Sequence, residues 1–503
     1  MRQSGILMPI SALPGAYGIG AFSNEAYRFV DFLKAAGQSL WQILPLGPTG
    51  YGDSPYQSFS TFAGNPYFID LTELISQGYL TNTQCAKVRN SSHDGSVDYE
   101  QIYKERFKLL KKAYQKAKEN GLFDEASYHT FYTQNAYWLA DYSLFTAIKK
   151  HFKQKSFLTW PKDIRTRTPA AMAHYRALLA DECECTCFIQ YEFYRQWTAL
   201  KQYANEQGIR IIGDIPIYVA LDSADVWANP QLFQLDEKLV PTSVAGCPPD
   251  AFSETGQLWG NPLYDWAKHQ ETNYAWWTQR VKHCYNLYDI LRIDHFRGFE
   301  SYWAIPYADE TAEFGRWEKG PGYAIFQALK QRLGNLDIIA EDLGFLTDRV
   351  RRLLKRCGYP GMKVLQFAFD SGPTNVYLLH NHTQNSVVYT GTHDNDSILG
   401  WFATLSPKTR KFMKEYLGIQ SNKEIGWKLI QAAFRSVADT VIIPMQDYLE
   451  LGSESRMNTP ATLGNNWMWR ANRNDFSSEL ADRIYRLTIV YERAQKSTEA
   501  QES

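Results

Sequence analysis

The sequence predicts an α/β protein, a (β/α)8 TIM barrel with an inserted, mostly helical subdomain and long loop insertions. Three observations predict this fold class. Eight short runs of residues are almost continuously apolar, which is typical of parallel strands buried on both faces. Helical patterns separate several of these runs. In four runs an acidic residue follows the apolar stretch, as expected where barrel strands end in a functional site.

The predicted strands and helices are spread along the whole chain. The strands occupy residues 5–11, 40–46, 210–217, 290–296, 337–344, 362–369, 387–394 and 440–447. Helical spacing marks residues 24–36, 191–207, 274–288, 323–332 and 347–357, and two further helices between 408 and 438. In such a barrel the working residues lie at the C-terminal ends of the strands.

Two intervals between predicted strands are too long for simple crossover connections. We therefore expect one catalytic barrel over residues 1–503 with two insertions. Residues 72–186 show helical spacing and the charge of a solvated helix face, which predicts a mostly helical subdomain. Residues 218–265 have a loop-like composition, and long irregular segments in compact domains tend to be binding loops or lids. The second segment therefore predicts a loop insertion over the active site.

The bulk composition excludes several classes of protein. A formal net charge of −1 gives no electrostatic reason to expect binding to nucleic acid or to an anionic membrane surface. The N-terminus lacks a signal-peptide pattern and no stretch reaches the roughly 18 apolar residues of a spanning helix, so we expect a cytoplasmic protein. The seven cysteines predict free thiols, because the alternate spacing of Cys183, Cys185 and Cys187 differs from that of zinc sites. Aromatic residues, at 15%, are numerous enough to line a groove as well as a core.

The chain is organised around residues 290–298, which read ILRIDHFRG. Arg292 and Asp294 lie two residues apart, so on a strand their side chains point to the same face. An arginine beside a buried carboxylate keeps that carboxylate ionised and fixes its direction, as a nucleophile requires. Taken alone, the pair is equally consistent with a structural ion pair that closes a strand.

Four predicted strands end in an acidic residue: Asp214, Asp294, Glu341 and Asp394. In a barrel these carboxylates converge on one mouth, and crowded carboxylates raise one another's pKa, which suits a proton donor working near neutral pH. A retaining glycosidase needs one ionised and one protonated carboxyl group roughly 5 to 5.5 Å apart. Arg292 favours an ionised Asp294, whereas Glu341 has no cation in its own strand and fits an acid/base role. His393 is either a ligand of sugar hydroxyls or a histidine held by a structural hydrogen bond.

Motifs of other enzyme classes are incomplete or absent. Residues 15–20, GAYGIG, have the spacing GxxGxG rather than the GxGxxG of dinucleotide-binding loops. Residues 394–396, DND, lack the glycine and the distal glutamate of an EF-hand. The sequence contains no GxxxxGK[ST], HExxH or GxSxG. We therefore expect no cofactor and no metal ion.

Longer motifs resemble the 4-α-glucanotransferases of glycoside hydrolase family 77, known as amylomaltases or disproportionating enzymes, in the α-amylase clan. The resemblance spans nearly the whole chain. It is carried by IGDIPIYV, LRIDHFRGF, AEDLG and GTHDND at the strand ends, and by ALPGAYGIG, WQILPLGPTGYGDSPYQSFSTFAGNPY, PPDAFSETGQLWGNPLYDW and MNTPATLGNNWMWR elsewhere. Two departures are small: Cys247 stands where an aliphatic residue is expected, and Ala461 where glycine is usual.

The resemblance implies a role for each matching residue. Asp294 would be the nucleophile, Glu341 the general acid/base, and Asp394 the residue that holds sugar hydroxyls and stabilises the transition state. The implied substrate-binding residues are Arg292, His295, His393, Asp214, Tyr56, Asp250, Gln257, Trp259, Asn466 and Trp467. Of these, Asp250, Gln257 and Trp259 would lie on a loop that covers the site.

The resemblance implies transfer of a 1,4-α-glucan segment to the 4-hydroxyl of an acceptor, by retaining double displacement through a covalent glycosyl-enzyme. The implied partners are maltooligosaccharides, amylose and glycogen- or starch-derived glucans, while the chain itself is a monomer or a dimer. Three alternatives remain: an amylase-like hydrolase, a catalytically silent glucan-binding protein, and a debranching enzyme. The last is disfavoured because the chain lacks room for a second catalytic domain.

Overall fold

Eight parallel strands close into a barrel, in the order β1-β12-β11-β10-β9-β6-β3-β2. The structure is a computed structural model that describes residues 2–50, 52–90, 95–249, 253–344 and 346–494. The barrel strands are Gln3–Leu7 (β1), Leu40–Gln42 (β2), Arg210–Ile215 (β3), Ile290–Ile293 (β6), Ile338–Ala340 (β9), Gly361–Val364 (β10), Ser386–Tyr389 (β11) and Thr440–Pro444 (β12). Each strand overlaps one of the eight apolar runs, so the predicted (β/α)8 barrel is confirmed. The strands are shorter than the runs, since each run continues past the C-terminal end of its strand.

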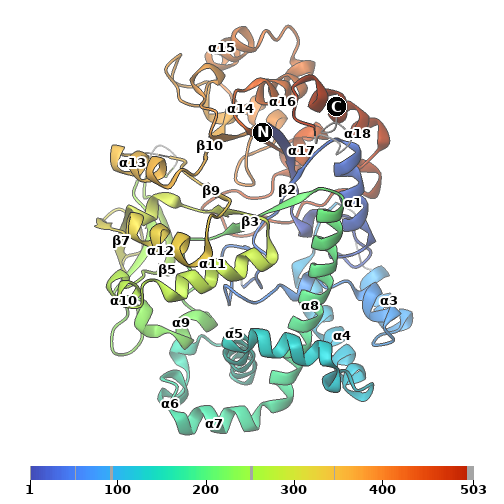
Figure 1. Ribbon diagram of the computed structural model, residues 1–503, viewed down its shortest axis with the longest axis vertical. Helices are drawn as coiled ribbons and strands as arrows, with labels where there is room; N and C mark the ends of the chain where they lie inside the picture. Colours follow the sequence, from blue (N-terminus) through green and yellow to red (C-terminus); the bar gives the residue numbers. More distant parts are fainter. Residues whose placement is uncertain (1, 51, 91–94, 250–252, 345, 495–503) are drawn as a thin grey trace.

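Helices surround the barrel (Figure 1). Those outside the segment 72–186 are Asn24–Ala35 (α1), Ala224–Ala228 (α9), Trp266–Glu271 (α10), Ala275–Leu287 (α11), Tyr323–Leu333 (α12), Asp348–Cys357 (α13), Ile398–Thr404 (α14), Pro407–Leu417 (α15), Ile425–Arg435 (α16), Met445–Tyr448 (α17) and Ser478–Val490 (α18). Helix α13 illustrates how local sequence sets these limits. The Thr347 side chain accepts a hydrogen bond from the Val350 amide at its start, and Gly358 ends it with φ of 75°.

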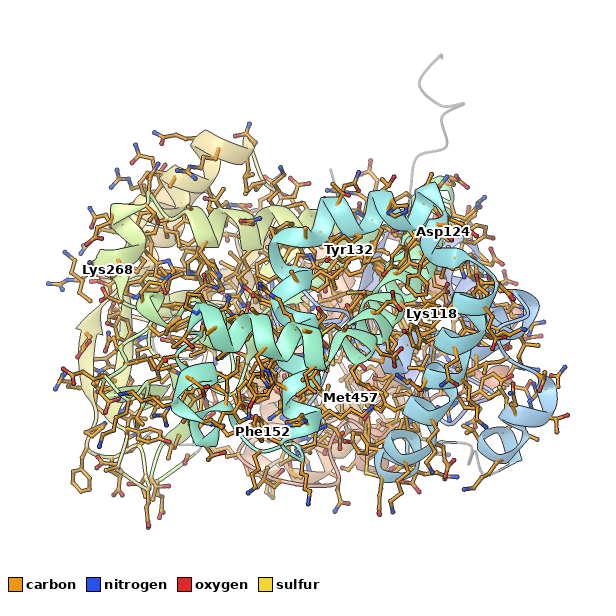
Figure 2. The ribbon with its side chains drawn as sticks, turned by 90° about the horizontal axis from the view of Figure 1, so that it is seen from below. Lys118, Asp124, Tyr132, Phe152, Lys268 and Met457 are labelled. Atoms are coloured by element: carbon orange, nitrogen blue, oxygen red, sulfur yellow. The ribbon has the colours of Figure 1, made fainter. Side chains whose placement is uncertain are left out.

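The segment between β2 and β3 is built from helices that extend away from the barrel (Figure 1). They are Leu71–Ser76 (α2), Asn82–Asn90 (α3), Tyr99–Glu119 (α4), Ala126–His151 (α5), Lys162–Arg165 (α6), Pro169–Leu178 (α7) and Ala180–Glu206 (α8). Figure 2 shows several of these helices across the face seen from below, with Lys118 on α4 and Tyr132 on α5. Helix α8 returns from this region to the barrel, where it leads into β3.

A second, four-stranded antiparallel sheet has the order β5-β4-β7-β8. Its strands are Ser243–Cys247 (β4), Gln257–Pro262 (β5), Ser301–Pro306 (β7) and Arg316–Lys319 (β8). The segment 218–265 therefore holds two strands and a short helix, which differs from the loop-like interpretation of its sequence. The physical reason is that β4 pairs with β7, which lies after β6, so half of the sheet comes from outside the segment.

The two ends of the described chain meet beside the N-terminal ends of strands β1 and β12. The Arg493 side chain, 0% exposed, donates hydrogen bonds to five backbone carbonyls. These belong to Gln3 at the start of β1 and to Phe434, Ser436, Ala438 and Asp439 before β12. A single guanidinium thus ties the last residues to the pair of strands where the barrel closes.

Arg493→Ala is expected to lower the free energy of unfolding by about 3 kcal/mol, because it removes the hydrogen bonds of a buried guanidinium to five backbone carbonyls. Urea unfolding followed by circular dichroism measures this change. Arg486→Ala is the matched control, since Arg486 is exposed on α18. Equal unfolding midpoints for the two variants would contradict a closing role for Arg493.

Candidate active site

Three of the four acidic strand ends, Asp294, Glu341 and Asp394, open into one cleft with a volume of about 1290 Å³, whereas Asp214 is buried outside its lining. Asp294 directly follows β6, Glu341 directly follows β9, and Asp394 lies five residues beyond β11. Eleven of the predicted site residues line this cleft: Tyr56, Gln257, Trp259, Arg292, Asp294, His295, Glu341, His393, Asp394, Asn466 and Trp467. The eight parallel strands thus bring together residues that are up to 411 positions apart (467 − 56).

Arg292 links two of the acidic residues. Its Nη1 lies 2.5 Å from Asp214 Oδ2 and 3.1 Å from Asp294 Oδ1. Asp214 stands opposite Arg292 in the ladder of β3 and β6, so strand register sets the first contact. Burial alone would lower the pKa of Arg292, but the two carboxylates raise it well above its ordinary value. The guanidinium therefore remains charged, and the Asp294 side chain, 30% exposed, is the one presented to the cleft.

Tyr56 connects Asp214 to the cleft wall. Its hydroxyl donates a hydrogen bond of 2.8 Å to Asp214 Oδ2, which is buried beneath the cleft. Its ring stacks on His393 at 5.1 Å and lies 6.1 Å from the ring of Trp467. Aromatic faces of this kind can pack on the apolar faces of sugar rings.

Glu341 is held by two backbone amides. The His295 N–H donates to Oε2 at 2.7 Å and the Leu343 N–H donates to Oε1 at 2.8 Å. Burial, and then the charge of Asp294, raise the pKa of Glu341 to about 7, while Arg292 and the two amides oppose that rise. A carboxyl group with this pKa can both donate and accept a proton near neutral pH.

His295 contributes its backbone as well as its ring. Its φ of 49° is in the left-handed region, and this conformation turns the chain after β6 so that its N–H reaches Glu341. The imidazole meets the Trp259 ring edge to face at 4.9 Å. Burial lowers the pKa of His295 to about 4, so the ring is neutral at pH 7. Trp259 in turn donates from Nε1 to Gln257 Oε1 at 3.1 Å.

Asp394 is held from a distant part of the chain. Asn458 Nδ2 donates to Asp394 Oδ1 at 2.6 Å, and Arg456 Nη2 donates to the Asp394 carbonyl at 2.8 Å. His393 Nε2 lies 3.4 Å from the same Oδ1. Arg456 and Asn458 do not directly follow a predicted strand, so their positions in the sequence did not mark them as site residues. The only signal was the extended motif that begins at Met457, which gave no reason to choose these two residues.

Two predicted site residues, Asn466 and Trp467, lie on the loop after Asn458. Asn466 lines the cleft, and its side chain also closes its own loop, accepting from the Thr459 amide at 2.9 Å and donating to the Thr462 carbonyl at 3.1 Å. Ala461, which replaces the usual glycine, has φ of 61°, a conformation that glycine adopts more easily. Asp250 lies outside the described residues, as do residues 251 and 252.

Among the described residues, no group of three His, Cys, Asp or Glu side chains is arranged to hold a metal ion. Within the same residues, no helix combines the length and the apolar character needed to cross a bilayer.

Comparison with known proteins identifies the family. A family model described as 4-alpha-glucanotransferase matches residues 8–475. The 4-alpha-glucanotransferase of Clostridium butyricum is 50% identical over 490 residues, covering 97% of this chain and 100% of that protein. The Thermus thermophilus enzyme of the same name is 46% identical over 501 residues, covering 98% and 99%. The solved structure of the Streptococcus agalactiae amylomaltase in complex with acarbose has a TM-score of 0.96 and 41% identity, covering 98% of this chain and 100% of that one.

With this cleft, and with relatives of this identity along their full length, the chain belongs to the 4-alpha-glucanotransferases of glycoside hydrolase family 77.

Proposed function

We propose that the enzyme transfers a segment of a 1,4-α-glucan to the 4-hydroxyl of a second glucan or of glucose, by a retaining double displacement. Asp294 is the nucleophile, Glu341 the general acid/base, and Asp394 the residue that holds sugar hydroxyls. One observation carries the proposal: the same cleft holds a carboxylate beside Arg292 and a carboxyl group with a pKa of about 7. A carboxylate directed by a cation and a carboxyl group that exchanges its proton near neutral pH are the two partners that retaining glycosidases require.

In the first half-reaction, the Asp294 carboxylate attacks the anomeric carbon while Glu341 protonates the departing glycosidic oxygen. The bond between the anomeric carbon and that oxygen breaks, and a glucan with a new 4-hydroxyl leaves. Arg292 directs the Asp294 carboxylate, with Nη1 3.1 Å from its Oδ1. The glucosyl unit remains on Asp294 as an ester.

In the second half-reaction, Glu341 acts as the base. Its carboxylate takes the proton from the 4-hydroxyl of an acceptor glucan, whose oxygen displaces Asp294 with overall retention of configuration. The two amides from His295 and Leu343 favour the carboxylate form, which is the form that this step needs. Glu341 thereby regains the proton for the next cycle.

Transfer rather than hydrolysis requires that sugar outcompete water at the second step. The cleft is suited to this because residues of strand β5 and of the loop 456–467 line it in addition to the residues at the barrel strand ends. Tyr56, Trp259 and Trp467 supply rings for packing against sugars in both donor and acceptor positions. The acarbose complex of the Streptococcus agalactiae relative supports maltooligosaccharides as the substrate class.

We also propose that the barrel over residues 1–503 is a single catalytic unit, with 72–186 as a helical subdomain and 218–265 as the insertion over the site. The β5 residues Gln257, Leu258 and Trp259, which line the cleft, support the last assignment. The alternative activity is amylase-like hydrolysis, which shares the first half-reaction and differs in the acceptor.

Incubation with maltotriose alone is expected to give glucose and a ladder of longer glucans, with the total of reducing ends unchanged. Transfer conserves reducing ends because each broken bond is replaced by a new one, whereas hydrolysis adds one per bond. Chromatography of the products and a reducing-end assay measure the two quantities. An increase in reducing ends that matches bond cleavage would identify a hydrolase.

Above pH 7, kcat/KM for maltotriose is expected to fall about tenfold per pH unit, because Glu341 must be protonated for the first half-reaction. Below pH 7, protonated Glu341 predominates and this limb is absent. Glu341→Gln is expected to retain a residual activity without the alkaline limb. A wild-type profile that stays flat to pH 9 would remove Glu341 from the acid role.

Glu341→Gln is expected to lower kcat on maltotriose by about 10² to 10⁴-fold. With α-maltosyl fluoride, whose leaving group needs little protonation, this variant should form a covalent adduct on Asp294 that accumulates, since no base activates the acceptor. Mass spectrometry of the intact protein and its peptides detects the adduct. Asp342→Asn is the matched control, because the adjacent Asp342 carboxylate accepts from the Met362 amide at 2.7 Å and should leave turnover largely intact.

If Glu341→Gln accumulated no adduct, or if the adduct lay on a residue other than Asp294, the covalent route proposed here would be wrong.

A further inference from the structure

Residues 456–458 bind Asp394 at two points, although more than sixty residues separate them along the chain (456 − 394 = 62). The Asn458 amide donates to the Asp394 carboxylate at 2.6 Å, and the Arg456 guanidinium donates to the Asp394 carbonyl at 2.8 Å. Arg456 also donates from Nε to the Asn458 carbonyl at 2.8 Å. One arginine therefore fixes the backbone of Asn458 relative to the backbone of Asp394.

The segment that carries Asn458 is itself anchored. Met457 is 2% exposed, and its carbonyl accepts from the Trp467 amide at 2.5 Å. Ser455 is fully buried, and its carbonyl accepts from the Gln446 side chain at 3.2 Å, just beyond β12. The Asn458 amide group is thus held in place before any substrate arrives.

Asp394 has few other restraints on its carboxylate. Its side chain is 45% exposed, and His393 Nε2 lies 3.4 Å from its Oδ1. A half-exposed carboxylate held only by a contact of that length would sample several rotamers. The short bond from Asn458 selects one of them.

We propose that Asn458 is a positioning residue that orients the Asp394 carboxylate for the transfer reaction. Arg456, which bonds the carbonyls of both residues, sets the distance between Asn458 and Asp394. This inference rests on the role assigned to Asp394 in the proposed function. Asn458 acts on the reaction through Asp394, by holding Oδ1 and leaving Oδ2 free to accept from sugar hydroxyls. Orientation of this kind affects the turnover step more than substrate binding.

Other ionisable groups around this pair shape the test. Tyr56 and His393, whose rings stack on each other, lie near Asp394, and Arg456 donates a hydrogen bond to the Asp394 carbonyl. Asp294 and Glu341 line the same cleft. All of these groups are present in both the wild type and an Asn458 variant, so the ratio of the two activities at each pH isolates the effect of residue 458.

The test is Asn458→Asp, with kcat/KM for maltotriose measured from pH 5 to pH 8. At pH 8 two ionised carboxylates would repel each other at the 2.6 Å contact, and the ratio of variant to wild-type activity is expected to be about 0.01. At pH 5 the pair can share one proton, the protonated oxygen again donates to Asp394, and the ratio is expected to rise at least about tenfold. Asn458→Ala, which restores no donor at any pH, should lower kcat with a ratio that does not depend on pH.

Asn385→Asp is the matched control for added charge, because Asn385 is exposed just before β11, at the opposite end of the strand that leads to Asp394. Its ratio should stay near one throughout. A ratio of variant to wild-type activity that does not change with pH for Asn458→Asp overturns the proposal. A constant ratio near one would mean that Asn458 does not orient Asp394. A constant low ratio would mean that Asn458 has a structural role only. Thermal melting of each variant verifies folding.

Failure of this inference is distinguishable from failure of the proposed function. If Asp294→Asn and Glu341→Gln retain normal turnover, the chemistry assigned to the cleft is wrong whatever Asn458 does. If both variants lose turnover and the Asn458→Asp ratio is flat, only the positioning role is wrong.

Discussion

The paired contacts of Arg292 are the constraint on which the rest of the cleft depends. A guanidinium with 4% of its side chain exposed lies between Asp214 and Asp294. Burial of these charges would be costly without mutual pairing, and removal of one partner would leave the others uncompensated. Because Asp214 faces Arg292 across the ladder of β3 and β6, the pairing is built into strand register. A slip of one residue would turn both side chains to the other face and dismantle the site.

That arrangement also gives different surroundings to the two carboxyl groups that we propose react. Asp294 is next to the cation, whereas Glu341 is buried, faces two backbone amides, and has its pKa raised to about 7. The charge on Asp294 is itself one cause of that rise, so the proposed nucleophile helps to keep Glu341 protonated. Two chemically similar side chains thereby acquire the different surroundings that the opposite roles proposed for them require.

The sequence was sufficient to predict the barrel, because strands buried on both faces leave nearly continuous apolar runs, such as 440–444 and, interrupted by Arg292, 290–293. It was not sufficient for the sheet β5-β4-β7-β8. Strand β8 is four residues long and largely exposed, with Trp317 43% accessible, so it carries no burial pattern. The sheet also depends on pairing between β4 and β7, which are more than fifty residues apart, and local sequence does not encode such a partner.

In the cleft, too, some features could be predicted from the sequence and others could not. Side chains at strand ends, such as Glu341, were predictable because topology alone brings them together. The His295 amide, Arg456 and Asn458 were not, because their contacts depend on the path of the chain after it leaves the strands. The loop 456–467 extends this argument to transfer itself: it holds Asp394 through Asn458 and places Trp467 beside Tyr56 and His393. Water can attack a glycosyl ester from many directions, but a sugar acceptor needs its ring and its hydroxyl in place at once. A loop that fixes both the rings of Trp467, Tyr56 and His393 and the carboxylate proposed to bind sugar hydroxyls would therefore favour the acceptor that requires both.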